Sequence, residues 1–215
     1  MLLMPASETE RLLAFDTGTL YEAAGEGAFA PGLQVMSGQG RVAGPALTVA
    51  CPPGDNLAVH LAIAQAREGE VLVVQTHDWS YGVWGEVLTA AAMARGIGAL
   101  VMDGSVRDVD AIRELGFPVF ARGAALVGTR KREPGTVRAP VTCCGRLVQP
   151  GDLIVADVSG LVAIAPERVE EVLAAAAARH EKEAGMLRQL RDGRTTVELL
   201  GLDGGPEPPG SIGSR

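Results

Sequence analysis

The sequence is poor in the residues that mark disulfide-stapled proteins. Its 215 residues include three cysteines, Cys51, Cys143 and Cys144, and aromatic residues make up 4% of the chain. An odd number of cysteines, two of them adjacent, does not suit a disulfide framework and predicts a reducing compartment. No basic partner stands beside Cys143 and Cys144, so we interpret them as inert thiols. A chain of this length buries a core without staples.

Long apolar runs are also missing. No segment reaches the length of about 18 uncharged apolar residues that marks a membrane-spanning helix. The first 13 residues lack the basic start and the apolar run of a signal peptide. We therefore predict a cytoplasmic protein without a membrane partner.

Basic residues are outnumbered, and the formal net charge is −7. The basic cluster Arg130-Lys131-Arg132 is small for a surface that contacts phosphates, and we interpret it as a solvated loop. We predict no nucleic-acid partner. An acidic protein can still bind a small anion through one arginine and a metal ion.

Several motifs of common enzyme classes do not occur. The sequence has no GxGxxG turn before a helix, no P-loop, no HExxH, no CxxC and no GxSxG. Dinucleotide, nucleotide, zinc and serine-hydrolase functions therefore lack their usual residues. The sequence also has no glycine-rich loop suited to S-adenosylmethionine, so methyl transfer ranks last among the candidate functions.

The middle of the chain alternates short apolar runs with helical patterns. The apolar runs at 70–75, 98–102 and 117–120 are typical of strands that are buried on both faces. Helical patterns at 86–95 and 109–115 separate them. Consecutive strand and helix units predict a parallel sheet, in which ligands lie beyond the carboxyl ends of the strands.

The two ends of the chain have different patterns. Possible caps at Ser7 and at Asp16 or Thr17 predict two short N-terminal helices, and a long C-terminal helix begins at Pro166 after a stretch of antiparallel strands. We predict an α/β fold with a mixed sheet and helices at both termini. The predicted domain covers residues 1–200, and a flexible tail covers residues 201–215.

Two loops of the predicted sheet carry residues with chemical potential. Glu86 opens a helix, and Arg107 and Asp108 follow the next strand after twenty intervening residues. A helix followed by a strand returns the chain to the same end of a sheet, so both loops can line one cleft. A purely structural interpretation is also available, in which Asp108 caps the next helix and pairs with Arg107 at the surface.

Such a cleft suits a keto acid. Carboxylates bind hard cations such as Mg²⁺, and arginine offers a planar fork for a carboxylate. The free N–H groups around Val87 and Leu88, at the start of the helix, favour anions. A metal ion chelated by a pyruvyl group would stabilise the enolate that remains when the adjacent carbon-carbon bond is cleaved.

The segment at residues 84–123 reads WGEVLTAAAMARGIGALVMDGSVRDVDAIRELGFPVFARG. Together with its flanks, over roughly residues 40–170, it resembles the RraA-like family, which includes class II 4-hydroxy-4-methyl-2-oxoglutarate and 4-carboxy-4-hydroxy-2-oxoadipate aldolases. The aldolases of that family carry an acidic residue, twenty intervening residues and then Arg-Asp, and Glu86, Arg107 and Asp108 match this pattern. Members regarded as regulators of ribonuclease E often lack the acid.

The resemblance implies a function and a role for each of these residues. Asp108 would ligate Mg²⁺ or Mn²⁺ directly, Glu86 would hold the ion through water, and Arg107 would bind the carboxylate and keto oxygen of the substrate. The pyruvyl site would be completed by the backbone amides of Gly85, Glu86, Val87 and Leu88. The reaction would release pyruvate and a second keto acid, with oxaloacetate decarboxylation by the same chemistry.

The resemblance also implies a fold and an assembly. The fold would be a swivelling β/β/α domain, and the protein would be a homotrimer, or a hexamer of two trimers, with active sites between subunits. An acid from a neighbouring subunit's C-terminal region would complete some of these sites. Glu181, Glu183 and Glu198 are candidates, although a charged helix face explains the first two equally well.

Other polar residues leave alternatives open. The loop at residues 76–83 differs from the glycine-rich segment of many relatives, which bears on the identity of the substrate. In this loop His77 and Asp78 are either proton carriers or solvated residues. We interpret His60 as a packed or capping histidine and His180 as a surface one. The alternative function is a regulator that binds an RNA-processing enzyme without catalysis.

Overall fold

The computed structural model describes residues 7–27, 32–38 and 40–202. The chain divides into two compact units, Met1–Ala176 and Ala177–Arg215, and each is described by itself. The single domain expected over residues 1–200 stays a prediction. The expected flexible tail lies outside the described residues from residue 203 onward.

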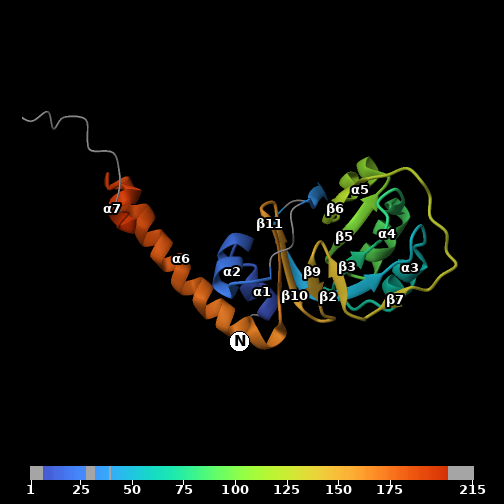
Figure 1. Ribbon diagram of the computed structural model, residues 1–215, viewed down its shortest axis with the longest axis horizontal. Coiled ribbons are helices and arrows are strands. Elements are labelled where there is room, and N and C mark those ends of the chain that lie inside the picture. The colour runs from blue at the N-terminus through green and yellow to red at the C-terminus, as the bar shows by residue number, and fades with distance from the viewer. Residues whose placement is uncertain (1–6, 28–31, 39, 203–215) are drawn as a thin grey trace, which may run out of the picture. The chain divides into compact units, whose positions relative to one another are not determined.

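Nine strands of the described part of the first unit form one mixed sheet (Figure 1). They are β1 (Gln34–Ser37), β2 (Val42–Ala50), β3 (Val71–Gln75), β4 (Gly82–Trp84), β5 (Ala99–Val106), β6 (Val119–Ala124), β7 (Thr136–Val137), β10 (Leu153–Asp157) and β11 (Gly160–Ile164). The order is β1-β6-β5-β3-β2-β10-β11, with β4 paired to β5 and β7 paired to β2.

The direction of the strands follows the sequence pattern. The β2–β3, β3–β5, β4–β5 and β5–β6 pairs are parallel. The pairs that involve β1, β7, β10 and β11 are antiparallel. The predicted α/β fold with a mixed sheet is therefore confirmed, with its parallel part in the middle of the chain and its antiparallel part mostly after residue 136.

The central strand β3 is apolar on both faces. Val71, Leu72, Val73 and Val74 are all fully buried. Side chains alternate along a strand, so Leu72 and Val74 contribute to one core cluster, whereas Val71 and Val73 contribute to a second cluster on the other face. Burying each such side chain stabilises the fold by about 1.5–3 kcal/mol.

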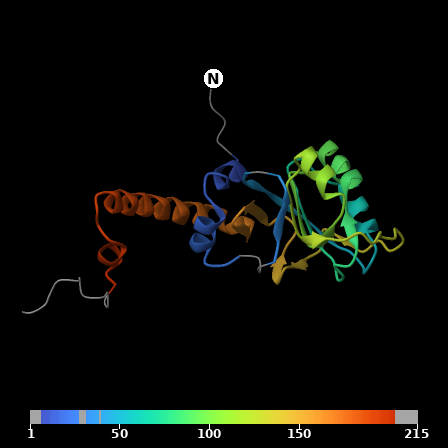
Figure 2. The same cartoon turned by 90° about the horizontal axis from the view of Figure 1, so that it is seen from above.

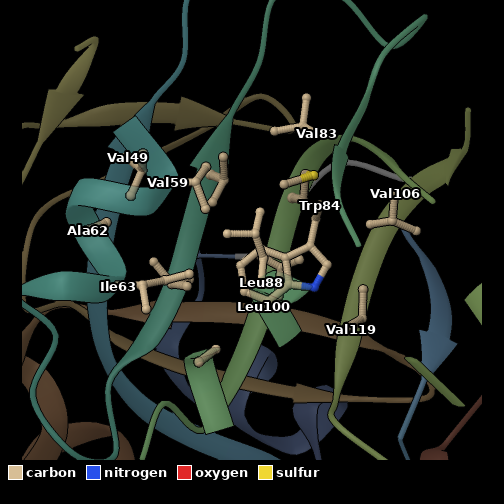
Figure 3. Close-up of a cluster of buried hydrophobic side chains, with 14 of the residues drawn as sticks. Val49, Val59, Ala62, Ile63, Val83, Trp84, Leu88, Leu100, Val106 and Val119 are labelled. Atoms are coloured by element: carbon tan, nitrogen blue, oxygen red, sulfur yellow. The ribbon is translucent and has the colours of Figure 1, made fainter. Parts of the chain in front are cut away.

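Three helices, α3 (Leu57–Ala64), α4 (Glu86–Ala94) and α5 (Val109–Leu115), form one layer beside the parallel strands (Figure 2). Figure 3 shows Val59 and Ile63 of α3 and Leu88 of α4 in the cluster that also holds Leu100 of β5 and the indole of Trp84. This apolar contact fixes the starts of α3 and α4 relative to the sheet.

Strands β4 and β5 differ from the sequence prediction. We expected residues 76–85 to be a loop and β5 to end at residue 102, but β4 forms inside that loop and β5 continues to Val106. The extension is stable because β4 pairs with Ser105 and Val106 on one side and β6 pairs with them on the other. A three-residue strand carries too little periodicity to be visible in sequence.

The opposite face of the sheet is covered by the hairpin of β8 (Val141–Cys143) and β9 (Arg146–Val148). The short helices α1 (Glu8–Leu12) and α2 (Thr17–Ala24) contribute to a third cluster with β10 and β11. The expected caps are present, since the side chain of Ser7 accepts from the N–H of Glu10 and that of Asp16 accepts from the N–H of Thr19.

A single 3-10 turn, Pro166–Arg168, precedes the long helix α6 (Val169–Arg191). The first part of α6 belongs to the first unit, where Val172 and Leu173 are buried. The second unit holds the rest of α6 and the helix α7 (Thr196–Leu200). Over the described ranges, none of the helices combines the length and the apolar character that crossing a membrane requires.

Candidate active site

Two loops meet at the carboxyl end of β5. The N–H of Arg107 donates to the carbonyl oxygen of Trp84 at 2.7 Å, which extends the pairing of β4 with β5. The next residue on each side, Asp108 and Gly85, then lie in contact, and the N–H of Glu86 donates to Asp108 Oδ2 at 3.3 Å. The structure therefore brings the main chain at residue 86 against Arg107 and Asp108.

Glycine at position 85 makes this approach possible. A Cβ atom there would lie 2.4 Å from Asp108 Oδ2 and 3.1 Å from Arg107 Cγ, and the first of these distances is shorter than any normal contact. At Gly82 a Cβ atom would lie 2.5 Å from the carbonyl oxygen of Ala125 and 2.9 Å from Arg107 Cβ. Both glycines are needed for steric reasons, because the stem of Arg107 and the carboxylate of Asp108 occupy the space of a side chain.

Asp108 has an unusual backbone conformation. Its φ of 53° and ψ of 39° are left-handed, which is uncommon for a residue other than glycine and costs of order 1 kcal/mol. Asp108 is at the N-cap position of α5, as expected, but its side chain accepts no hydrogen bond from that helix. The expected cap is wrong in this respect, because the carboxylate turns toward Glu86 and Arg107 instead.

The guanidinium of Arg107 lies beside the same carboxylate. Its Nε donates to Asp108 Oδ2 at 3.3 Å, and its side chain is 47% exposed. The Arg107 side chain makes no other hydrogen bond with the described residues, so the two terminal amino groups of its guanidinium are left for a ligand. An exposed pair of this kind contributes at most about 1 kcal/mol to stability, so the pairing orients the two groups more than it stabilises the fold.

These groups line a pocket of about 250 Å³. Its wall consists of Asn56, His60, Gly82, Val83, Trp84, Gly85, Val87, Leu88, Arg107, Asp108, Gly128, Thr129 and Lys131. Glu86 is exposed and is not among the lining residues, although its N–H contacts Asp108. Its expected part in metal binding through water stays a prediction.

The start of α4 is held firmly at this pocket. The indole N–H of Trp84 donates to Thr89 Oγ1 at 2.7 Å, and the hydroxyl of Thr89 donates to the carbonyl oxygen of Gly85 at 3.0 Å. The N–H groups of the first turn of a helix have no partner within the helix. Val87 and Leu88 line the pocket, and the expected binding of a pyruvyl group by their N–H groups stays a prediction.

A second wall of the pocket was not predicted from the sequence. Asn56, the N-cap residue of α3, and His60 lie four positions apart, and each has a buried atom, Oδ1 and Nε2 respectively, without a hydrogen-bond partner in the described residues. Asn56 Nδ2 donates to the carbonyl oxygen of Val83 at 2.9 Å, and Oδ1 is the atom of this amide that has no partner in the described residues. The signal was present as two polar residues four positions apart in an otherwise apolar helix.

Lys131 completes this second wall. Burial and then the positive charge of Lys131 lower the pKa of His60 below its ordinary value. His60 is therefore neutral at pH 7, and Nε2 can accept a hydrogen bond or a proton. The interpretation of residues 130–132 as a solvated loop was incomplete, because Lys131 lines the pocket even though it is exposed.

The donor set fits a metal ion that is shared with water and substrate. Mg²⁺ commonly takes one or two carboxylates and fills its other positions with water and substrate oxygens. Asp108 offers a carboxylate whose Oδ2 already accepts two hydrogen bonds, and Oδ1 accepts none from the described residues. In those same residues no cluster of three or more His, Cys, Asp or Glu side chains forms a protein cage for a metal.

Other candidates lie away from this pocket. His77 is exposed, and Asp78 accepts from the N–H of Ser80 at 2.8 Å, a bond that lowers its pKa; neither residue lines the pocket. Cys143 and Cys144 are buried, and a hydrogen bond with Cys144 together with burial raises the pKa of Cys143. This pKa shift agrees with inert thiols.

The C-terminal candidates belong to the second unit. Glu181 and Glu198 line a separate depression between α6 and α7, and Glu183 pairs with Arg179 at 2.8 Å. His180 is exposed on α6, as expected of a surface histidine. The role of an acid from a neighbouring subunit stays a prediction.

Comparisons with known proteins agree with the resemblance seen in the sequence. The family model RraA-like, described as Aldolase/RraA, matches residues 17–163. A protein of Halalkalibacterium halodurans named "Putative 4-hydroxy-4-methyl-2-oxoglutarate aldolase" is 35% identical over 153 residues, which are 71% of this chain and 73% of that protein.

Solved structures share the fold. An uncharacterized protein from Pseudomonas syringae pv. tomato has a TM-score of 0.79 and 29% identity, with 91% of this chain and 96% of that chain covered. Streptomyces coelicolor RraAS2, described as an unusual member of the RNase ES inhibitor RraA protein family, has a TM-score of 0.76 and 27% identity, with 87% and 99% covered. With the family model matched over most of its length, the chain belongs to the RraA-like family.

Proposed function

We propose that the protein is a divalent-metal-dependent aldolase. It would cleave a 4-hydroxy-2-oxo dicarboxylic or tricarboxylic acid to pyruvate and a second keto acid. Relatives named for aldolase activity support the reaction type. The observation that carries the proposal is the contact of Arg107, the Asp108 carboxylate and the N–H of Glu86 at one wall of a pocket.

The first wall suits the pyruvyl half of the substrate. Arg107 presents a planar fork for its carboxylate, and the N–H groups of Val87 and Leu88 favour the same negative charge. Asp108 would hold Mg²⁺ or Mn²⁺ directly, and Glu86 would hold it through water. When bound, such an ion supplies Lewis-acid polarisation of the keto acid.

The second wall suits the other half. Lys131 is positively charged, and the amide of Asn56 is fixed by its bond to Val83. Lys131 would bind a carboxylate at the distal end of the substrate. A substrate with carboxylates at both ends would then span the pocket between Arg107 and Lys131.

The reaction needs an acceptor for one proton. When the bond between C3 and C4 of the substrate breaks, its electron pair stays on C3 as an enolate, and the proton of the C4 hydroxyl leaves. His60 Nε2 is buried, unpartnered in the described residues and neutral at pH 7, so it is suited to take this proton. Loss of carbon dioxide from oxaloacetate leaves the same enolate, and the first wall would act on it in the same way.

Pyruvate release in the presence of Mg²⁺ or Mn²⁺ tests the proposal. Arg107→Ala and Asp108→Ala should each lower kcat/KM by roughly 100-fold or more, because each removes a charged group that contacts the reacting half. Arg113→Ala, which changes an exposed arginine of α5, is the matched control and should keep full activity. The proposal fails if no substrate of this class releases pyruvate, or if a chelator has no effect.

We also propose a homotrimer, or a hexamer of two trimers, with sites between subunits. An acid such as Glu181, Glu183 or Glu198 from a neighbouring subunit would then reach the pocket. Light scattering gives the mass of the assembly. Mixing inactive Arg107→Ala protein with inactive protein that lacks the acid would restore activity if one site draws residues from two subunits, and would not if each site is complete in one chain.

A second candidate function is regulatory binding to an RNA-processing enzyme without catalysis. Structural similarity to the Streptomyces coelicolor RraA protein and to an RNA-processing inhibitor from Thermus thermophilis favours it. Tight capture of such an enzyme that is unaffected by Arg107→Ala, in a protein that releases no pyruvate, would support this function over the first.

A further inference from the structure

The segment between β6 and β7, residues 125–135, supplies Thr129 and Lys131 to the pocket. It contains no helix, and it is held by the chain that precedes α3. The N–H of Arg130 donates to the carbonyl oxygen of Gly54 at 2.9 Å, and the carbonyl oxygen of Arg130 accepts from the N–H of Asn56 at 3.0 Å. We refer to residues 125–135 as the β6–β7 segment.

The bonding of Arg130 sets the direction of its neighbours. Arg130 and Asp55 form a parallel bridge, and the side chain of Arg130 donates to the carbonyl oxygen of Pro53 at 3.1 Å. Side chains alternate along an extended segment, so Thr129 and Lys131 are directed to the other side. That side is the pocket.

Asp55 is the buried centre of this contact. It is fully buried. Its Oδ1 accepts from the N–H of Leu57 at 2.9 Å, and its Oδ2 accepts from the N–H groups of Arg132 at 2.8 Å and Glu133 at 3.3 Å. One carboxylate thus joins the first turn of α3 to the β6–β7 segment on the far side of Lys131.

The electrostatics agree with an ionised Asp55. Burial by itself would raise the pKa of this carboxyl group, but the N–H donors of Leu57, Arg132 and Glu133 and the charge of Arg130 outweigh it, and the pKa lies below its ordinary value. A buried carboxylate that accepts from two separate chain segments is costly to replace, because either segment is left with unpaired N–H groups.

We propose that Asp55 is a positioning residue for the proposed reaction: it holds the β6–β7 segment against α3, so that Lys131 and Thr129 face Asn56 and His60 and complete the subsite for the distal carboxylate. The proposal rests on the proposed function. Asp55 does not line the pocket itself, and it acts through Lys131.

Asp55→Asn tests this role. The amide has the shape of the carboxylate but presents an NH₂ group to one of the facing N–H donors. We expect kcat/KM for a substrate with two carboxylates to fall roughly 10- to 100-fold, mainly through a higher KM, because displacement of a binding group by about 1 Å has effects of this size. Exchange of the methyl protons of pyruvate, which lacks the distal carboxylate, should stay within about threefold of the original protein.

The matched control is Asp157→Asn. Asp157 is also buried and accepts from the N–H groups of Thr17 and Ser159, but it lies on β10, away from the pocket. This variant should lose stability without a change in KM. A double-mutant cycle adds a second comparison: in a Lys131→Met background, Asp55→Asn should lower kcat/KM by less than about threefold, because Lys131 is the group through which it acts.

Hydrogen exchange gives a readout that does not depend on activity. In Asp55→Asn, protection of the amides at residues 129–133 should fall while that of β3 and β5 is retained. Unchanged protection would overturn the proposal, and so would equal losses of aldol cleavage and pyruvate exchange. If Asp55→Asn does not fold, an unchanged KM in Lys131→Met would overturn it. If the original protein shows neither aldol cleavage nor exchange of the pyruvate methyl protons, the proposed function is wrong. Reduced amide protection in Asp55→Asn would then show that Asp55 has a structural role only.

Discussion

Replacing Gly85 by alanine tests whether the close approach of two loops creates the site. The added Cβ would lie 2.4 Å from Asp108 Oδ2, and contacts below 3.0 Å are essentially never seen for real Cβ atoms. The carboxylate would therefore have to move by about 0.6 Å or more. That movement removes the hydrogen bond from the N–H of Glu86, which is already 3.3 Å long.

The expected result is a large loss of activity with a small loss of stability. We expect kcat/KM for pyruvate release to fall by roughly 100-fold, because displacement of a reacting group by a fraction of an ångström to 1 Å has this effect. Unfolding free energy should fall by about 1 kcal/mol, since alanine is a poorer N-cap residue than glycine. The backbone adds little, because the φ of −159° at Gly85 is accessible to alanine.

Gly123→Ala is the matched control for this experiment. Gly123 lies on β6, and a Cβ atom there would meet no atom within 4 Å. This variant should retain activity. Steady-state kinetics and thermal unfolding of both variants form the assay. Full activity of Gly85→Ala, or equal losses in the two variants, would refute the argument that the Asp108 carboxylate acts from its observed position.

Three further predictions follow from the buried polar contacts. Glu70 accepts two hydrogen bonds from Arg138, at 2.7 and 3.0 Å, so Glu70→Gln should cost about 1–3 kcal/mol in urea unfolding at pH 7. Burial opposes ionisation of Glu70, but the hydrogen bonds from Arg138 and from the N–H of Arg67, with the charges of both arginines, outweigh it and lower the pKa. The stabilisation is therefore present above the ordinary value of 4.5 and is lost as pH falls through the folded-state pKa, where the variant and the original protein should converge. Thr89→Val leaves the indole N–H of Trp84 buried without its acceptor and should lower the unfolding free energy by about 1–3 kcal/mol. The pKa of His60 is lowered, so the acid limb of kcat/KM should lie below pH 6.5, and His60→Gln should lower the rate and remove that limb from the pH profile.

The parts of the fold that were predictable are those with a strong local pattern. Four consecutive buried residues, from Val71 to Val74, marked the central strand, and the capping residues Ser7 and Asp16 marked two helix starts. The strand β4 was not predictable, because three residues carry little periodicity and their pairing with β5 depends on the rest of the sheet.

The candidate site divides in the same way. The meeting of the Glu86 and Arg107 loops follows from the return of a helix and strand to one end of a sheet, which sequence spacing captures. The contribution of Lys131 does not, since it depends on hydrogen bonds between Asp55 and a segment 77 residues further along the chain. Spacing also did not reveal that Asp108 turns its carboxylate away from its own helix, because that direction depends on a left-handed backbone.

The origin of the two pocket walls has a consequence for how the protein can change. One wall is formed by main-chain pairing within the sheet. The other wall includes the eleven-residue β6–β7 segment, which is held mainly by the buried carboxylate of Asp55. Replacing this segment by one of another length or charge would leave the pairing of β4 with β5 intact. Substrate preference in this scaffold can therefore diverge while the groups that handle the pyruvyl end stay the same.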